Sequence, residues 1–349
     1  MNFKTPAFWE SFNIVSLALW PLSLLFGAIV WLRKKAFALS LFSSQSVRVP
    51  IIIVGNLRVG GTGKTPVVIA LAQSLQAMGF HPGIISRGYL SQHSSNQHTV
   101  MPVLTTSDVS LVGDEPKLLA HYLEPLHIPV WISRNRWQCA KALLNNYPIC
   151  DVIISDDGLQ HYALKRKPAR IGGCDIEIVV QDSRGLGNAF LLPAGPLRES
   201  QSRSRDLSIQ LNSSTTSQTN LWDRDSGQIS LSLTHGLAYQ LIAPHQQRPL
   251  EDFKGVEVLA IAGIGHPDKF FTQLRQAGLT MSTIALPDHY DYVSRPLALE
   301  LTAKAQFILM TEKDAVKCQH MRDPRIWVIP LKLDLPNELL SYIKEVITR

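Results

Sequence analysis

Short apolar runs alternate along the chain with segments whose apolar residues recur at helical spacing. In the first half, the runs predict strands at residues 49–54, 83–86, 130–132, 152–155 and 176–180. Between them, helical patterns cover residues 66–78, 115–123 and 138–145. Near-continuous apolar strands separated by helices are typical of a parallel sheet that helices cover on both faces.

A second, shorter alternation follows after a polar stretch. It predicts strands at residues 256–262, 283–286, 307–310 and 327–330, and helices near 268–277, 296–305 and 336–347. The intervening residues 200–230 are rich in Ser, Thr, Gln and Asn and show no helical period. We therefore expect an α/β chain divided into an N-terminal helix (1–35), a larger domain (36–205), a polar β linker (206–235) and a smaller α/β domain (236–349).

The N-terminal segment has a different pattern. Residues 11–32 contain no charged side chain, Glu10 precedes them, and Arg33, Lys34 and Lys35 follow. This length can span a bilayer, although Pro21 and Gly27 are equally compatible with a kinked helix lying in the membrane interface. A buried core helix is the alternative, and a secretory signal is disfavoured because no small-residue cleavage site follows.

Composition narrows the class of protein. The 349 residues are 45% hydrophobic and 18% charged, as expected of a chain that folds around large cores. The net charge of +6 favours an anionic partner such as a nucleotide, an acidic substrate or a membrane surface. No basic run with interleaved aromatic residues indicates nucleic-acid binding, and the four cysteines lack the C-x-x-C spacing of a zinc site.

Glycines follow the first predicted strand and lead to Gly63-Lys64-Thr65 and a helix. In such a loop, backbone N–H groups surround phosphate oxygens, the lysine reaches the β- and γ-phosphates, and the threonine hydroxyl holds Mg²⁺. The strict pattern has glycine where this chain has Arg58. The order of strand, glycines, Lys-Thr and helix still predicts a site for ATP and Mg²⁺. Its residues are Arg58, Val59, Gly60, Gly61, Thr62, Gly63, Lys64 and Thr65.

Three further positions are candidates for chemistry. Asp156 and Asp157 end a hydrophobic strand, where a phosphate-loop fold places an acid that holds Mg²⁺. We expect Asp156 at the metal, and Asp157 either at the metal or beside the attacking group. Asp114 begins a predicted helix and is either its cap or a catalytic base. His289 follows a strand of the second domain and could pair with a carboxylate across the interdomain space.

Arginines recur at predicted strand ends. Guanidinium groups bind phosphate bidentately, so a set of them near one edge predicts a cleft for an anionic substrate. The candidates are Arg87, Arg134, Arg136 and Arg184, and Arg198 lies in a similar loop. The sequence Thr311-Glu312-Lys313-Asp314 also ends a strand, and a base-contacting or interdomain role is open for it.

Taken together, these segments resemble the tetraacyldisaccharide 4'-kinase family over nearly the whole chain. Beyond the phosphate loop, the resemblance rests on Ile-Ser-Arg-Gly-Tyr, Val-Gly-Asp-Glu-Pro, Ser-Asp-Asp-Gly-Leu-Gln-His, Leu-Leu-Pro-Ala-Gly-Pro-Leu-Arg-Glu, Pro-Asp-His-Tyr and Thr-Glu-Lys-Asp-Ala-Val-Lys. It implies a P-loop NTPase-like α/β/α domain, a second α/β domain, and ATP- and Mg²⁺-dependent phosphorylation of the 4'-hydroxyl of a tetraacyldisaccharide 1-phosphate to form lipid IVA.

The resemblance also implies site roles and a location. Asp114 would be the base and His289 its partner, while Lys64 and Asp157 would act at the transferred phosphoryl group. The N-terminal helix would hold the protein at the cytoplasmic face of the bacterial inner membrane, where the anionic glycolipid lies. Neither nucleic acid nor an obligate protein partner is implied.

Two other functions use the same motifs. A membrane-tethered NTP switch or assembly ATPase would need the phosphate loop and the acids, but no base beside the γ-phosphate. A soluble sugar or nucleoside kinase would leave the uncharged segment 11–32 unexplained.

Overall fold

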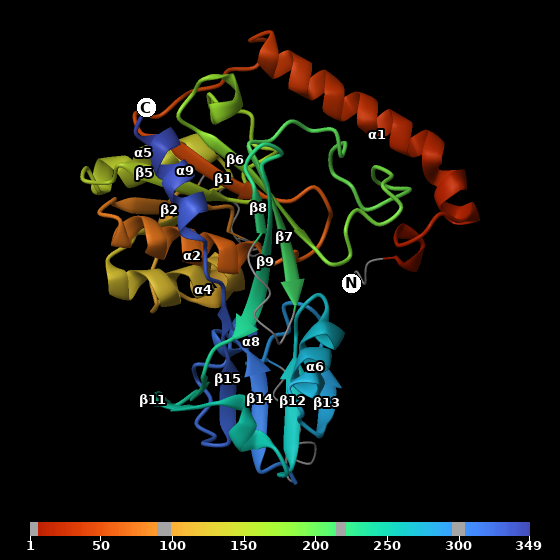
Figure 1. Ribbon diagram of the computed structural model, residues 1–349, viewed down its shortest axis with the longest axis vertical. Helices are drawn as coiled ribbons and strands as arrows, with labels where there is room; N and C mark the ends of the chain where they lie inside the picture. Colours follow the sequence, from red (N-terminus) through yellow and green to blue (C-terminus); the bar gives the residue numbers. More distant parts are fainter. Residues whose placement is uncertain (1–5, 89–98, 214–220, 295–303) are drawn as a thin grey trace.

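The computed structural model describes residues 6–88, 99–213, 221–294 and 304–349. Two β-sheets, each covered by helices, lie end to end, and the long helix α1 lies on the outside of the molecule on the side of the larger one (Figure 1). The C-terminus lies on the side of the larger sheet. The α/β class expected from the sequence is confirmed.

The larger sheet has the strand order β16-β9-β7-β6-β1-β5-β2-β4-β3, and β8 pairs with β9. Strands β4, β2, β5, β1, β6, β7 and β9 run parallel, so their carboxyl ends share one edge. The bounds are β1 Ile51–Gly55, β2 Pro82–Ser86, β3 Met101–Val103, β4 Val130–Ile132, β5 Val152–Asp156, β6 Ile176–Asp182, β7 Leu207–Ser213, β8 Leu221–Asp223, β9 Gln228–His235 and β16 Leu331–Lys332.

Helices bury both faces of this sheet. Apolar residues of α2 (Lys64–Ala77), α4 (Asp114–Leu123) and the C-terminal α9 (Asn337–Ile347) pack on one face. Those of α5 (Arg136–Asn146) pack on the other. Shorter helices are α3 (Val109–Val112), η2 (Glu124–Leu126) and η3 (Ala169–Ile171). Burial on both faces explains why the central strands read as continuous apolar runs.

The smaller sheet has the order β11-β10-β15-β14-β12-β13. Its strands are β10 Ala238–Gln240, β11 Ala243–Arg248, β12 Val258–Ala262, β13 Met281–Ala285, β14 Phe307–Thr311 and β15 Ile326–Ile329, and its helices are η4 Leu250–Phe253, α6 Pro267–Gln276 and α8 Glu312–Ala315. Strands β13, β12, β14 and β15 are parallel. Aromatic residues of η4 and α6 fill one face of this sheet.

Two segments differ from the predicted division. The residues predicted as a polar β linker do form strands, β7 and β9, but these extend the larger sheet in parallel and do not form a separate linker. The C-terminal helix was assigned to the smaller domain, but Leu339, Ile343 and Val346 of α9 join the core of the larger one. The chain crosses back because β16 pairs with β9 before α9 begins. Most of the helix predicted at 296–305 lies outside the described residues.

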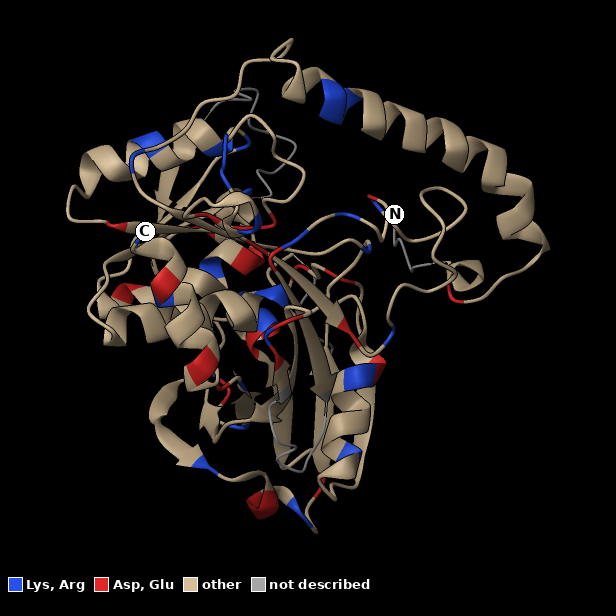
Figure 2. Cartoon of the chain, turned by 45° about the horizontal axis from the view of Figure 1, so that its top comes forward, with Lys and Arg blue, Asp and Glu red and all other residues tan. Residues whose placement is uncertain are grey.

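Helix α1 (Ile14–Ala38) begins after a 3₁₀ turn, η1 (Ala7–Trp9). Asn13 and Ser16 form a reciprocal capping box at its start. Of its side chains only Ser16 and Ser23 are buried, and its apolar residues face solvent. It is long and apolar enough to cross a membrane, with a mean hydropathy of 2.1. Figure 2 shows its single basic cluster near the C-terminal end. These features fit association with a membrane and not a buried core helix.

Candidate active site

The phosphate loop connects β1 to α2 at the carboxyl edge of the larger sheet. Gly60 and Gly63 have φ angles of 105° and 81°, which side chains with a Cβ rarely adopt. Helix α2 begins directly at Lys64, so its first unpaired N–H groups and positive dipole end face the loop. This is the local geometry that surrounds phosphate oxygens.

Lys64 is held by groups from two neighbouring strand ends. Its Nζ donates to Asn56 Oδ1 at 3.3 Å and lies 3.8 Å from Asp157 Oδ1. Arg198 donates to both carboxylate oxygens of Asp157, each at 3.1 Å, and also bonds to Asn56. Burial tends to raise the pKa of Asp157, but Lys64 and Arg198 outweigh it and hold this pKa well below its usual range. Asp157 is therefore an ionised group beside Lys64.

Asp156 is the last residue of β5, in register with Val54 of β1, so it lies next to the phosphate loop. Its Oδ2 accepts a hydrogen bond of 3.2 Å from Ser86, whereas its Oδ1 is buried without a partner among the described residues. Burial and the negative charge of Glu115 raise its pKa to about 6. A buried carboxylate oxygen without a donor fits a hard cation such as Mg²⁺.

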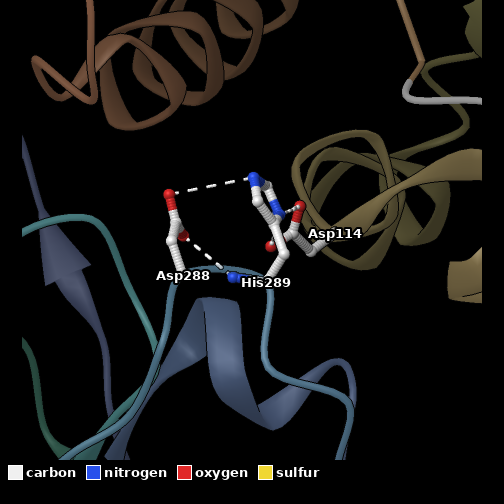
Figure 3. Close-up of side chains that lie close together, drawn as sticks. All are labelled: Asp114, Asp288 and His289. Carbon is white, nitrogen blue, oxygen red and sulfur yellow. Dashed lines mark hydrogen bonds and ion pairs between the residues drawn. The ribbon is translucent and has the colours of Figure 1, made fainter. Parts of the chain in front are cut away.

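A second pair of side chains crosses between the domains. Asp114 starts α4 in the larger domain, and His289 follows β13 in the smaller one. The Nδ1 atom of His289 lies 3.0 and 2.9 Å from the two carboxylate oxygens of Asp114 (Figure 3). Asp114 is 5% exposed and His289 is 49% exposed. The structure thus brings together two residues 175 positions apart.

The two protonation equilibria are linked through this contact. Burial acts to raise the pKa of Asp114, but the hydrogen bond with His289 and the charge of Lys313 lower it to about 2. The same hydrogen bond raises the pKa of His289 above its usual value. An ionised carboxylate that bonds to an imidazole is an arrangement that can accept a proton from a hydroxyl group.

Two of the predicted arginines support the phosphate loop itself. Arg184 donates from Nη2 to the Gly61 carbonyl at 2.7 Å, pairs with Asp182, and contacts His266 of the smaller domain. The guanidinium of Arg58 is buried, where it pairs with Glu10 and donates to the Arg184 carbonyl. Arg58 therefore turns towards the start of α1, which differs from the predicted contact with phosphate.

The predicted substrate arginines divide by burial. Arg136 is buried and donates to the backbone carbonyls of Ser133 and Asp156 at 2.8 and 2.9 Å, so it braces two strand ends. This position differs from the predicted substrate contact. Arg87 and Arg134 are exposed, and they follow the adjacent parallel strands β2 and β4 at the carboxyl edge. They keep the accessibility that an anion site requires.

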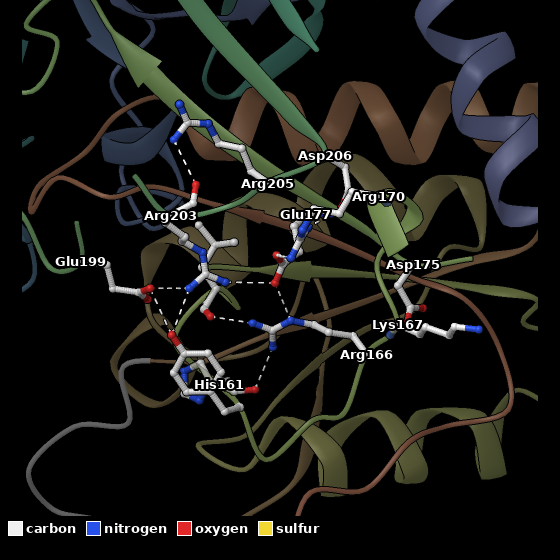
Figure 4. Close-up of polar contacts among 12 residues, drawn as sticks. His161, Arg166, Lys167, Arg170, Asp175, Glu177, Glu199, Arg203, Arg205 and Asp206 are labelled. Carbon is white, nitrogen blue, oxygen red and sulfur yellow. Dashed lines mark hydrogen bonds and ion pairs between the residues drawn. The ribbon is translucent and has the colours of Figure 1, made fainter. Parts of the chain in front are cut away.

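A separate arginine network is structural. Glu177 on β6 accepts from Arg166, Arg170 and Arg203 at 2.6, 2.7 and 3.0 Å (Figure 4). Burial alone would raise the pKa of Glu177, but these three guanidinium groups lower it. With their charges already paired, these arginines hold loops to the sheet and are not available to a substrate.

The sequence predicts no specific role for three residues of the site. Asn56 directly follows β1 and joins Lys64 to Arg198. Arg198 was recognised only as one of several arginines. Lys313 lies within the Thr-Glu-Lys-Asp segment, and its Nζ is 3.6 Å from Asp114. The position of Asn56 after the strand was a usable signal, whereas the contact of Lys313 depends on how the domains pack.

Comparisons with known proteins agree with this geometry. A family model described as LpxK, tetraacyldisaccharide-1-P 4'-kinase, matches residues 15–348. Tetraacyldisaccharide 4'-kinase of Polynucleobacter asymbioticus is 47% identical, covering 99% of this chain and 96% of that protein. The protein of the same name from Herminiimonas arsenicoxydans is 42% identical, covering 97% and 93%.

A solved structure is also similar over its whole length. It is the crystal structure of LpxK from Aquifex aeolicus in complex with ATP, which superposes with a TM-score of 0.74 at 26% identity. The match covers 96% of this chain and 100% of that chain.

Proposed function

This chain belongs to the tetraacyldisaccharide-1-P 4'-kinase family, and we propose that its reaction takes place at the edge of the larger sheet between Lys64 and Asp114. The chain is an ATP-dependent lipid kinase that phosphorylates the 4'-hydroxyl of tetraacyldisaccharide 1-phosphate, forming lipid IVA in lipid A biosynthesis. The assignment of roles below is supported by the contacts of each side chain.

The phosphate loop is the donor side. Its backbone N–H groups and Lys64 bind the phosphates of ATP, with Lys64 held in place by Asn56 and Asp157. Thr65 and Asp156 are the residues that would hold Mg²⁺, which neutralises phosphate charge when bound. The buried Oδ1 of Asp156, which has no hydrogen-bond partner in the described parts of the chain, supports this assignment.

The pair of Asp114 and His289 is the acceptor side. As the 4'-hydroxyl attacks the γ-phosphorus, the O–P bond to the leaving ADP breaks and the hydroxyl proton passes to this pair. Asp114 serves as the base, and His289 shares the charge through its Nδ1 contact. The observation that carries this role is the pair of contacts, 2.9 and 3.0 Å long, between residues of opposite domains.

The remaining features suit an anionic glycolipid. The exposed Arg87 and Arg134 would contact phosphate or sugar at the carboxyl edge. Helix α1 would lie on the cytoplasmic face of the inner membrane, because Arg33, Lys34 and Lys35 near its C-terminal end favour the cytoplasmic side. In this arrangement the lipid is presented to the active site from the bilayer.

A transfer assay tests the role of Asp114. With labelled ATP and tetraacyldisaccharide 1-phosphate in micelles, Asp114→Asn should lower kcat about 10²- to 10⁴-fold. ATP should still raise the melting temperature of this variant, because the phosphate loop is intact. The matched control is Asp252→Asn, which changes an exposed acid on η4 and should keep parental activity. An Asp114→Asn enzyme that labels the lipid at the parental rate would contradict the proposed base.

A further inference from the structure

Lys313 lies where the two domains meet at the proposed base. It is the second residue of the short helix α8, directly after β14. Its Nζ is 3.6 Å from Asp114 Oδ2, 3.3 Å from Glu115 Oε1 and 3.4 Å from Asp288 Oδ1. Its side chain is only 19% exposed. One ammonium group thus contacts carboxylates from both domains.

These carboxylates would otherwise repel one another. Ligand atoms of Asp114, Asp288 and His289 lie within 4.8 Å of one another, a spacing that proteins also use to hold a metal ion. Here the ammonium of Lys313 supplies the positive charge. Burial opposes this charge, but Glu115, Asp114 and Asp288 outweigh it and keep the pKa of Lys313 well above its usual range.

The backbone that carries Lys313 is itself fixed. The buried Asp314 accepts from the Gly263 N–H at 3.0 Å and from the Thr311 hydroxyl at 2.7 Å. It also accepts from the Tyr292 hydroxyl at 3.0 Å, and Tyr292 is three residues beyond His289. Lys317 pairs with Asp314 at 2.9 Å. Asp314 therefore ties α8 to the segment that carries His289, which limits the freedom of Lys313.

We propose that Lys313 is a positioning residue for phosphoryl transfer. Its ammonium group joins Asp114 of one domain to Asp288 of the other and so fixes the contact between Asp114 and His289. This inference rests on the proposed function of that pair. Lys313 itself neither accepts the proton nor binds the nucleotide. Through Lys313, the Thr-Glu-Lys-Asp segment would have an interdomain role.

The charge of Lys313 has a predictable effect on the pH profile. Within the described part of the chain, Lys313 and Lys317 from the α8 region and Asp288 from the loop after β13 act on the charges of the pair, and Glu115 from α4 pairs with Lys313. Lys313 lowers the pKa of Asp114 and also that of His289. Removing its charge raises both, so the acid limb of the kcat profile moves to higher pH whichever member holds the proton.

The test compares three variants of the full-length enzyme. Lys313→Met removes the charge and keeps the chain length, Lys313→Arg keeps the charge, and Lys254→Met removes an exposed charge elsewhere in the smaller domain. We expect Lys313→Met to lower kcat about 10- to 100-fold. Its acid limb should move up by about one pH unit. The KM for ATP should stay within about twofold, because the phosphate loop is untouched.

The other two variants separate charge from bulk. Lys313→Arg should retain the parental acid limb of the kcat profile. Lys254→Met should match the parent in kcat and in the position of this acid limb. A Lys313→Met enzyme with parental kcat and acid limb overturns the inference. So does an acid limb that stays in place while kcat falls equally in the Met and Arg variants, because that result shows a role in packing alone.

Folding and the proposed base are monitored separately. If thermal unfolding shows that Lys313→Met does not fold, Lys313→Gln replaces it and the same readings decide. Asp114→Asn is measured alongside. If it is inactive while Lys313→Met is unaffected, only the positioning role fails, whereas an active Asp114→Asn removes the proposed base itself.

Discussion

The donor and acceptor sides of the active site are built in different ways. The phosphate loop is contiguous in sequence, and Lys64 is held by Asn56 and Asp157 at the same edge of one sheet. On the acceptor side, the proposed base Asp114 contacts His289, which belongs to the other domain and lies 175 residues further along the chain. We infer that ATP binding depends on local geometry, whereas transfer depends on how the two domains sit against each other.

Among variants that leave Asp114 and His289 in place, the largest loss of kcat should come from the donor side. Lys64→Ala removes the positive charge at the phosphates and leaves Asp157 paired, among the described residues, with Arg198 alone. We expect kcat to fall about 10²- to 10³-fold. The rise in melting temperature with ATP should also be much smaller than in the parent. Normal stabilisation by ATP in this variant would show that Lys64 does not contact the nucleotide.

Two arginines close together in the sequence, Arg134 and Arg136, should separate a structural role from a role in binding the lipid. Arg136→Met leaves the Ser133 and Asp156 carbonyls without their buried donor, so stability should fall by about 2–4 kcal/mol in denaturant unfolding. The exposed Arg134→Met should change stability by less than about 0.5 kcal/mol and raise the KM for the lipid. A raised lipid KM with unchanged stability in Arg136→Met would contradict its bracing role.

A smaller effect, on the pH dependence of stability, is expected at the interdomain contact of Tyr122 with Glu312. Glu312 is buried, accepts from the Leu331 N–H at 3.0 Å and bonds to the Tyr122 hydroxyl. Burial raises its pKa from 4.5 to about 8. The folded protein therefore holds this proton more tightly than the unfolded chain, and the resulting stability is lost as the pH rises from 4.5 to about 8.

The variant Glu312→Gln tests this linkage. It should be more stable than the parent above pH 8 by about 1–3 kcal/mol, and the difference should vanish below pH 4.5. The exposed Glu251→Gln is the control and should leave the pH dependence unchanged. A stability difference that does not vary with pH would show that Glu312 is not protonated in the folded protein.

The sequence was informative where local geometry decides the outcome. Apolar runs predicted the buried parallel strands, and the phosphate loop and Asp156 followed from their places at strand ends. The sequence predicts only a β linker where β7 and β9 lie, because their alternating polar residues are not typical of strands buried inside a sheet. Whether an arginine such as Arg136 turns inward, and whether Lys313 reaches Asp114, depends on tertiary packing that a single sequence does not encode locally.

The central claim is that Asp114 and His289 act as one unit across the two domains. A double-mutant cycle in kcat tests this most directly, using Asp114→Asn, His289→Gln and the double variant. If the residues form one base, the double variant should be no slower than the more impaired single variant, within about threefold. Losses that multiply, so that the double variant falls by the product of the two single effects, would contradict the account.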